Sequence, residues 1–302
     1  MTLSDNARGI LLMCGSMLAF TLNDTMVKAV LESGIDLYQV ITLRGTLAAL
    51  GLVIIALVQN GRLALWPANG SDRKLLAFRT VGEVASTWCF LMALAHMPLA
   101  NISAIMQSLP LAVTLVAALL LGEPIGWRRI LAILVGFAGV LIIIRPGAEA
   151  FDEWSVLGLA SMGFVVLRDL TTRRFSRALP STTGAIWAAF AVTAMGAIGL
   201  SRMGWQDITL TQAALIAGAA VFLIGGYLLA IATMRVGEIG LVAPFRYTSL
   251  LWAILMGWLL FGTLPDQWTV IGSAIVVISG IYMLLRERKK RLMQLAPLGE
   301  EG

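Results

Sequence analysis

The sequence has few charged residues, one histidine and two cysteines. Charged residues make up 13% of the chain, about half of the share in soluble proteins, so a soluble domain is not expected. Cys14 and Cys89 lie in apolar segments and indicate neither a disulfide framework nor a metal site. His96 stands alone, and the sequence contains no HExxH, Walker or nucleophile-elbow motif. We therefore expect no enzyme activity and no cofactor.

Long apolar runs fill the chain instead, and 59% of its residues are hydrophobic. Each run is long enough to cross a bilayer core of about 30 Å. The first run has no A-x-A-like cleavage site after residues 9–22, so it predicts a membrane helix rather than a signal peptide. The expected fold class is an all-α membrane protein with ten transmembrane helices. The predicted spans are 7–30, 38–59, 75–97, 99–121, 127–144, 153–173, 184–201, 211–234, 238–261 and 267–286.

Lysine and arginine placement predicts the orientation in the membrane. With a cytoplasmic N-terminus, fifteen of the 22 basic residues fall on the cytoplasmic side, and only Arg145 and Arg202 fall in outer loops. Both termini are therefore expected in the cytoplasm, with the protein in the bacterial inner membrane. The net charge of +5 reflects this bias and does not indicate nucleic-acid binding. The basic tail, residues 287–302, is expected to anchor the topology, although contact with anionic lipids is an alternative.

An internal repeat divides the chain into two halves. The segment LLLGEPIGW (119–127) returns as LLFGTLPDQW (259–268), and in both copies a glycine follows the tryptophan twelve residues later. Asp24 and Asp169 are each followed by a basic residue four positions on. Five helices per repeat is an odd number, so the second copy enters the membrane from the opposite side and an inverted repeat is expected. The predicted repeats are residues 7–144 and 153–286.

The segment SLPLAVTLVAALLLGEPIGWRRILAILVGFAGVLII (108–143) resembles the EamA type of the drug/metabolite transporter superfamily. LNDTMVK (22–28), LRG (43–45) and APFRY (243–247) resemble the subgroup of S-adenosylmethionine and riboflavin carriers. In the second half, Thr263 departs from the family pattern, which has glutamate there. The resemblance implies a central cavity, lined largely by spans three, four, eight and nine, and alternating access without a nucleotide-driven motor.

Ionisable side chains inside the bilayer are costly and indicate function by default. A rise of about 1.5 Å per residue places them in two layers. The predicted outer layer holds Asp24, Lys28 and Arg44. The predicted inner layer holds Arg79, Glu83, Arg168, Asp169 and Arg246. We expect ion pairs in each layer to close one end of the cavity; pairs that only tie helices together are the alternative.

Specific pairs follow from these depths. Asp24 is expected to pair with Arg44 and Glu83 with Arg246, while Lys28 lies close enough to the interface to extend to water. The spans hold five basic and three acidic residues, and the two surplus positive charges favour a substrate carboxylate or phosphate. An arginine binds such a group with two parallel hydrogen bonds.

Polar, aromatic and proline residues complete the candidate site. The repeats place Gln107 opposite Tyr247, and Pro110 and Pro244 interrupt their spans as hinges or as packing kinks. Mid-span aromatic rings could stack on a planar ligand or serve only in helix packing. The predicted substrate-binding residues are Asn23, Glu83, Trp88, Gln107, Tyr227, Arg246, Tyr247 and Trp252.

A secondary transporter of a small polar organic metabolite is the function that this pattern favours. S-adenosylmethionine-like or other nucleoside or amino-acid-type metabolites, taken up by exchange, are the expected substrates. The alternatives are a proton-coupled exporter of amino acids and a riboflavin importer. Dispersed charges argue against a channel. The expected partners are the substrate and the bilayer, without nucleic acid, for a monomer or a homodimer.

Overall fold

A computed structural model describes residues 4–60, 66–67, 69–122, 126–145, 153–176, 179, 181–236 and 238–295. These residues form helices and turns without any strand. Ten of the helical spans are long and apolar enough to cross a membrane. The predicted all-α class with ten transmembrane helices is therefore confirmed. The motif residue Glu123 and the basic residues Arg62 and Arg177 lie outside the described residues.

Eight spans are continuous helices, and two are interrupted. The continuous ones are α1 (Asp5–Glu32), α2 (Leu37–Asn60), α3 (Gly70–His96), α6 (Trp127–Ile144), α7 (Trp154–Arg173), α8 (Ser181–Met203), α9 (Leu210–Val236) and α12 (Gln267–Leu295). The fourth span is divided into α4 (Leu99–Met106) and α5 (Leu109–Leu121). The ninth is divided into α10 (Ile239–Val242), the 3₁₀ helix η1 (Ala243–Tyr247) and α11 (Thr248–Phe261). The tail predicted to begin at residue 287 thus starts as a continuation of α12.

The repeated LLLG and LLFG segments end their helices in the same way. Gly122 follows α5 with a φ of 65°, and Gly262 follows α11 with a φ of 64°. Glycine takes this left-handed conformation without the strain that a Cβ would add, so it is the usual residue after a helix C-terminus. The sequence repeat is therefore a repeated helix ending.

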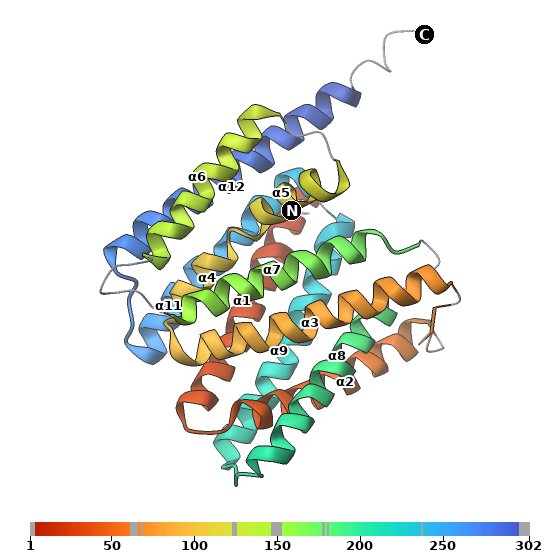
Figure 1. The fold of residues 1–302 in the computed structure, drawn as a ribbon, viewed down its shortest axis with the longest axis vertical. Helices are drawn as coiled ribbons and strands as arrows, with labels where there is room; N and C mark the ends of the chain where they lie inside the picture. The colour runs from red at the N-terminus through yellow and green to blue at the C-terminus, as the bar shows by residue number, and fades with distance from the viewer. Residues whose placement is uncertain are drawn as a thin grey trace.

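Each span of the first half packs against a span of the second half. The main pairs are α1 with α9, α3 with α7, α2 with α8, and α6 with α12, and α4 contacts α11. Figure 1 shows α6 and α12 side by side at the edge of the bundle, and α3 beside α7. In span numbers, the pairs are 1 with 8, 2 with 7, 3 with 6, 4 with 9, and 5 with 10. Exchanging each span of the first half with its counterpart five spans later gives the same set of pairs. The pairing is what two equivalent five-helix repeats would produce.

Backbone packs directly on backbone where α6 meets α12. A Cβ on Gly139 would lie 2.8 Å from the carbonyl oxygen of Gly272. A Cβ on Gly272 would lie 2.5 Å from the carbonyl oxygen of Gly139. Small residues allow membrane helices to approach this closely, because van der Waals packing drives their association in lipid.

The largest cluster of buried apolar side chains joins both halves at the centre of the bundle. It includes Ile41 of α2, Leu94 of α3, Ile102 of α4 and Ala253 of α11, all essentially inaccessible to solvent. This cluster fixes α4 and α11, and through them the two helix breaks described next.

Candidate functional site

The two interrupted spans break at corresponding places, each beside a proline. Pro110 lies in the first turn of α5, just after the break at Gln107 and Ser108. Pro244 lies in the first turn of η1, which separates α10 from α11. Proline removes a backbone donor and clashes with the preceding turn, and irregular backbone in a membrane needs protein or water around it. Both prolines therefore occur where the chain leaves regular helix inside the bundle.

A side-chain hydrogen bond links the two breaks. The Gln107 amide donates to the hydroxyl of Ser249, with 2.6 Å between Nε2 and Oγ. Gln107 is buried, and the hydroxyl of Thr21 on α1 donates to the carbonyl oxygen of Ser249 at 3.5 Å. The predicted position of Gln107 opposite Tyr247 is wrong by two residues, because Ser249, at the start of α11, faces the break in the fourth span.

Tyr247 packs against α12 and is buried. Its hydroxyl oxygen occupies the space beside Gly280 where a side chain would otherwise be. A Cβ on Gly280 would clash with it. Tyr247 is 5% exposed, and its hydroxyl has no hydrogen-bond partner among the described residues. The Trp252 indole nitrogen is likewise buried without an acceptor there. In this arrangement Tyr247 serves the packing of η1 on α12.

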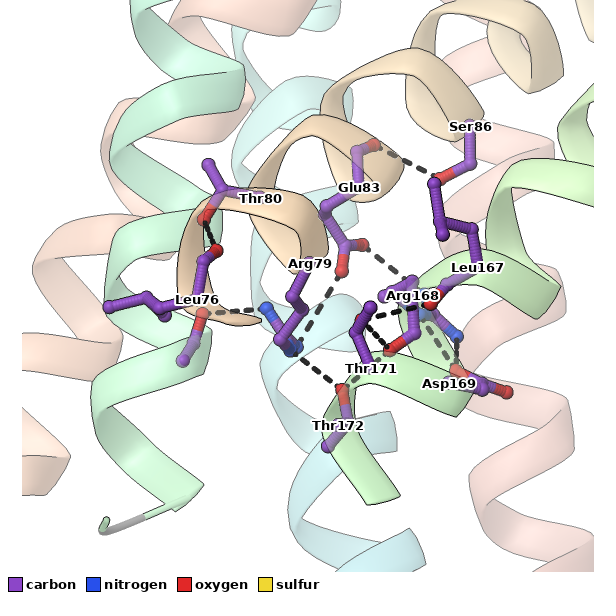
Figure 2. A network of polar contacts seen from close by, with 11 residues as sticks. Leu76, Arg79, Thr80, Glu83, Ser86, Leu167, Arg168, Asp169, Thr171 and Thr172 are labelled. Atoms are coloured by element: carbon purple, nitrogen blue, oxygen red, sulfur yellow. Dashed lines mark hydrogen bonds and ion pairs between the residues drawn. The ribbon is translucent and has the colours of Figure 1, made fainter. Parts of the chain in front are cut away.

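Four charged side chains form what we call the Glu83 cluster, shown in Figure 2: Arg79 and Glu83 of α3, and Arg168 and Asp169 of α7. Glu83 lies 3.6 Å from Arg79 Nη2 and 3.3 Å from Arg168 Nη1. Arg168 also contacts Asp169 at 2.9 Å. The predicted Glu83–Arg246 pair is therefore wrong for this structure, because both oxygens of Glu83 face other guanidinium groups.

Arg79 also connects this cluster to a third helix. Its Nη1 donates to the carbonyl oxygen of Gly184 in α8 at 2.7 Å, and its Nε donates to the hydroxyl of Thr172 in α7 at 3.1 Å. A little beyond, the Asp72 carboxylate accepts from the backbone nitrogen and the hydroxyl of Ser176. Polar contacts thus hold α3, α7 and α8 together at one end of the bundle.

Three residues, which we call the Asn23 cluster, meet between α1 and α2. Arg44 Nη1 donates to the Asn23 amide oxygen at 3.2 Å, and the Asn23 amide nitrogen donates to Asp24 Oδ1 at 2.8 Å. The expected Asp24–Arg44 interaction therefore passes through Asn23 rather than forming a direct ion pair. Arg44 is 7% exposed, and its Nε has no hydrogen-bond partner among the described residues.

Lys28 is buried rather than extended to water, contrary to the expectation. Its Nζ donates to the carbonyl oxygens of Leu94 and Met97 at 3.0 and 3.1 Å, and lies 3.0 Å from the Glu32 carboxylate. These carbonyls belong to the end of α3 and its C-cap, where helices leave acceptors without internal donors. The predicted interface residue is thus a buried cap for a neighbouring helix.

Arg246 has no such partner. Its guanidinium makes no hydrogen bond or ion pair within the described part of the chain, and the residue is only partly buried. Asp169 attracts it and Arg168 repels it from beyond contact distance. Glu32 adds a carboxylate for Lys28, so the surplus in the spans is one positive charge rather than two. Arg246 carries that charge in η1, next to the break in the ninth span.

Comparisons with known proteins agree with this architecture. The EamA-like transporter family model matches residues 7–145. The chain carries an EamA-like domain. An S-adenosylmethionine uptake transporter of Rickettsia bellii is 28% identical over 207 residues, which cover 68% of this chain and 69% of the relative. A riboflavin transporter of Vibrio cholerae is 29% identical over 203 residues, 67% of this chain and 68% of the relative.

Two further comparisons extend over nearly the whole chain. A pseudopaline exporter of Pseudomonas aeruginosa is 26% identical over 278 residues, 90% of this chain and 94% of the relative. A solved crystal structure with 18% sequence identity superposes with a TM-score of 0.63, covering 94% of this chain and 99% of its own. The second comparison concerns the fold alone. Together with the ten apolar helices, these findings support a multi-pass membrane protein whose named relatives are transporters.

The predicted aromatic residues of this EamA-like protein occupy two different places. Tyr227 of α9 is 41% exposed, stacks edge-to-face on Phe20 at 5.2 Å, and interacts electrostatically with Glu83 and Arg44. Tyr227 is thus within electrostatic range of charges in both the Glu83 and the Asn23 clusters. Trp88 points elsewhere, because its indole nitrogen donates to the Tyr38 hydroxyl at 3.3 Å beside a groove between α3 and α8.

Several participants were not predicted from the sequence. Ser249, Thr172 and the carbonyl of Gly184 complete the polar contacts described above. Hydroxyl and backbone groups carry no charge, so nothing in an apolar segment distinguishes them from packing residues. A usable signal existed only for Glu32, which follows Lys28 by four residues and so lies on the same helix face.

Proposed function

We propose that this protein is a secondary transporter that moves a small polar organic metabolite across the bacterial inner membrane. The substrate carries a carboxylate or phosphate that binds Arg246. The observation that supports this most is Arg246, which is partly exposed inside a ten-helix bundle and has no carboxylate partner among the residues that the structure describes. An unpaired charge in the membrane is costly, so an anionic ligand there would be bound strongly.

The surroundings of Arg246 support a substrate with a polar or cationic part as well. Asp169, close enough to attract Arg246, has a side chain that is 36% exposed, and Tyr227 offers an accessible ring and hydroxyl. Amino-acid-type or nucleoside-type metabolites combine an anion, a cation and a planar group. We therefore propose a metabolite of this type, S-adenosylmethionine-like, taken up by exchange, in line with the named uptake relative.

Alternating access between two inverted repeats, residues 7–144 and 153–286, is the proposed mechanism. The exchange symmetry of the helix pairs and the helix breaks beside Pro110 and Pro244 support it. The Glu83 cluster would close the cytoplasmic end, and the Asn23 cluster the outer end. Both termini would be cytoplasmic. Two observations favour transport over catalysis: the named relatives are transporters, and the proposed anion site is a single arginine, Arg246.

Export is a second candidate direction. The pseudopaline exporter matches 90% of this chain, whereas the uptake relative matches 68%. A riboflavin importer is a third possibility that rests on the Vibrio cholerae relative. Neither direction follows from geometry, because a symmetric carrier runs both ways under the gradient that it is given.

The test begins with a thermal-shift screen of purified protein against S-adenosylmethionine, riboflavin and amino acids, since a bound ligand stabilises the folded state. The ligand found is then used in counterflow with proteoliposomes. Arg246→Gln should abolish ligand stabilisation, and Arg246→Lys should weaken binding at least about tenfold because it loses the two parallel hydrogen bonds.

Arg128→Gln is the matched control, since Arg128 is exposed at the start of α6. It should leave binding unchanged. Normal ligand binding by Arg246→Gln would contradict an anion site at Arg246. Near-normal binding by Arg246→Lys would contradict only the two parallel hydrogen bonds and would leave the anion site in place. Counterflow that does not saturate would contradict a carrier.

A further inference from the structure

A groove of about 740 Å³ lies between α3 and α8. Its α3 wall includes Val84 and Trp88, and its α8 wall includes Met195 and Ile198. Tyr38 of α2 also lines the groove and accepts a hydrogen bond from the Trp88 indole nitrogen, which joins α3 to α2 there. The lining is therefore almost wholly apolar.

This groove is separate from the proposed substrate site. Its α3 residues, Val81, Val84 and Trp88 among them, recur at the spacing of one helix face. Glu83 lies on a different face of α3, within the Glu83 cluster. Val81 and Ile198 are 59% and 61% exposed, although both lie within membrane-spanning helices. Apolar side chains exposed at this depth face the hydrocarbon of the bilayer.

A hydrogen bond joins α3 to α8 near one end of the groove, and a positive charge lies toward the other. At one end, Arg79 of α3 donates to the Gly184 carbonyl oxygen of α8, which joins the two helices there. Arg202, in the last turn of α8, lines the groove. Its guanidinium is exposed and has no ion-pair partner among the residues that the structure describes.

We propose that this groove binds an anionic phospholipid, with one acyl chain along the apolar walls and the lipid phosphate on Arg202. A guanidinium binds a phosphate through charge-assisted hydrogen bonds, and a basic side chain at the membrane surface attracts anionic lipid. The acyl chain of the lipid fills the space between α3, from the first half of the protein, and α8, from the second half. The bilayer supplies this ligand at high local concentration, so a modest affinity suffices.

The test is native mass spectrometry of the purified full-length protein in mixed micelles with phosphatidylglycerol or phosphatidylcholine. The wild-type protein should retain phosphatidylglycerol about fivefold better than phosphatidylcholine, the preference expected from one basic side chain at a lipid surface. Arg202→Gln should remove this preference, and Arg202→Lys should keep most of it.

Filling the groove tests the acyl-chain part independently. Ala191→Phe puts a ring into the groove, whereas Ala197→Phe puts the same ring on another face of α8. Ala191→Phe should lower retention of both lipids, and Ala197→Phe should not. If Ala191→Phe does not fold, Ala85→Leu replaces it. Equal retention by all variants, or no lipid preference in the wild-type protein, overturns the proposal. Altered transport by Ala191→Phe with unchanged lipid retention also overturns it and assigns the groove to the substrate.

Discussion

Individual charged residues in this membrane bundle have very different environments. Lys28 has two carbonyls and a carboxylate, Glu83 has two guanidinium groups, and Arg246 has no hydrogen-bond or ion-pair partner among the described residues. Sequence position alone did not separate these cases. Two partners are local, Glu32 for Lys28 and Arg79 for Glu83, each four residues away on the same helix. The others are tertiary, because they come from segments far along the chain.

Lys28→Met should destabilise the protein by about 2 kcal/mol, because the carbonyl oxygens of Leu94 and Met97 lose a charged donor in a buried place. Thermal unfolding in detergent measures this effect. Lys74→Met, at an exposed position of α3, is the control and should change little. Equal melting temperatures for both variants would show that Lys28 does not support the end of α3.

The elements show how much of the fold could be predicted. Ten spans and the repeated helix endings at Gly122 and Gly262 followed from hydropathy and glycine placement, since both are local properties. Residues on the two sides of a break could not be matched, because register across non-adjacent helices depends on packing. The two-residue error between Tyr247 and Ser249 has this origin.

The close contact between α6 and α12 predicts a sharp glycine effect. Gly139→Ala would place its Cβ 2.8 Å from the Gly272 carbonyl oxygen, so the helices must separate. We expect a loss of about 1 to 3 kcal/mol in thermal unfolding. Gly225→Ala in α9 is the control, since nothing lies within 4 Å of its new Cβ. A Gly139→Ala protein as stable as Gly225→Ala would contradict the tight contact.

A surface contact joins α12 to the segment before α10. Arg288 Nε and Nη2 donate to the two oxygens of Glu238 at 2.7 and 2.9 Å, and these hydrogen bonds lower the pKa of Glu238 below its ordinary value of 4.5. A lowered pKa contributes stability that is present above pH 4.5 and is lost as the pH falls through the folded-state pKa.

The melting temperature of Glu238→Gln should therefore lie slightly below that of the wild-type protein at pH 7, and the two should converge below pH 4.5. Melting curves across this range measure the difference. A gap that widens on acidification would mean that the Glu238 carboxylate is not stabilised by Arg288.

At the scale of the whole molecule, the two clusters should control which end of the bundle opens. Asp169→Asn weakens the hold on Arg168 in the Glu83 cluster, and Asp24→Asn weakens the Asn23 cluster. Each variant should shift the population toward opening of its own end. Spin-label distances across the two ends measure both populations, and no shift in either variant would contradict gating by these clusters.

The exchange symmetry of the helix pairs has a thermodynamic consequence. In the proposed alternating access, contacts would break at one end while equivalent contacts form at the other. Most packing terms would then cancel, so the two open forms would differ little in free energy. The unequal polar clusters would decide the resting ratio. The Glu83 cluster has four charged side chains, whereas the Asn23 cluster has three residues. The two clusters therefore differ by a few polar interactions. A ligand that favours one form by about 1.4 kcal/mol would change that ratio tenfold.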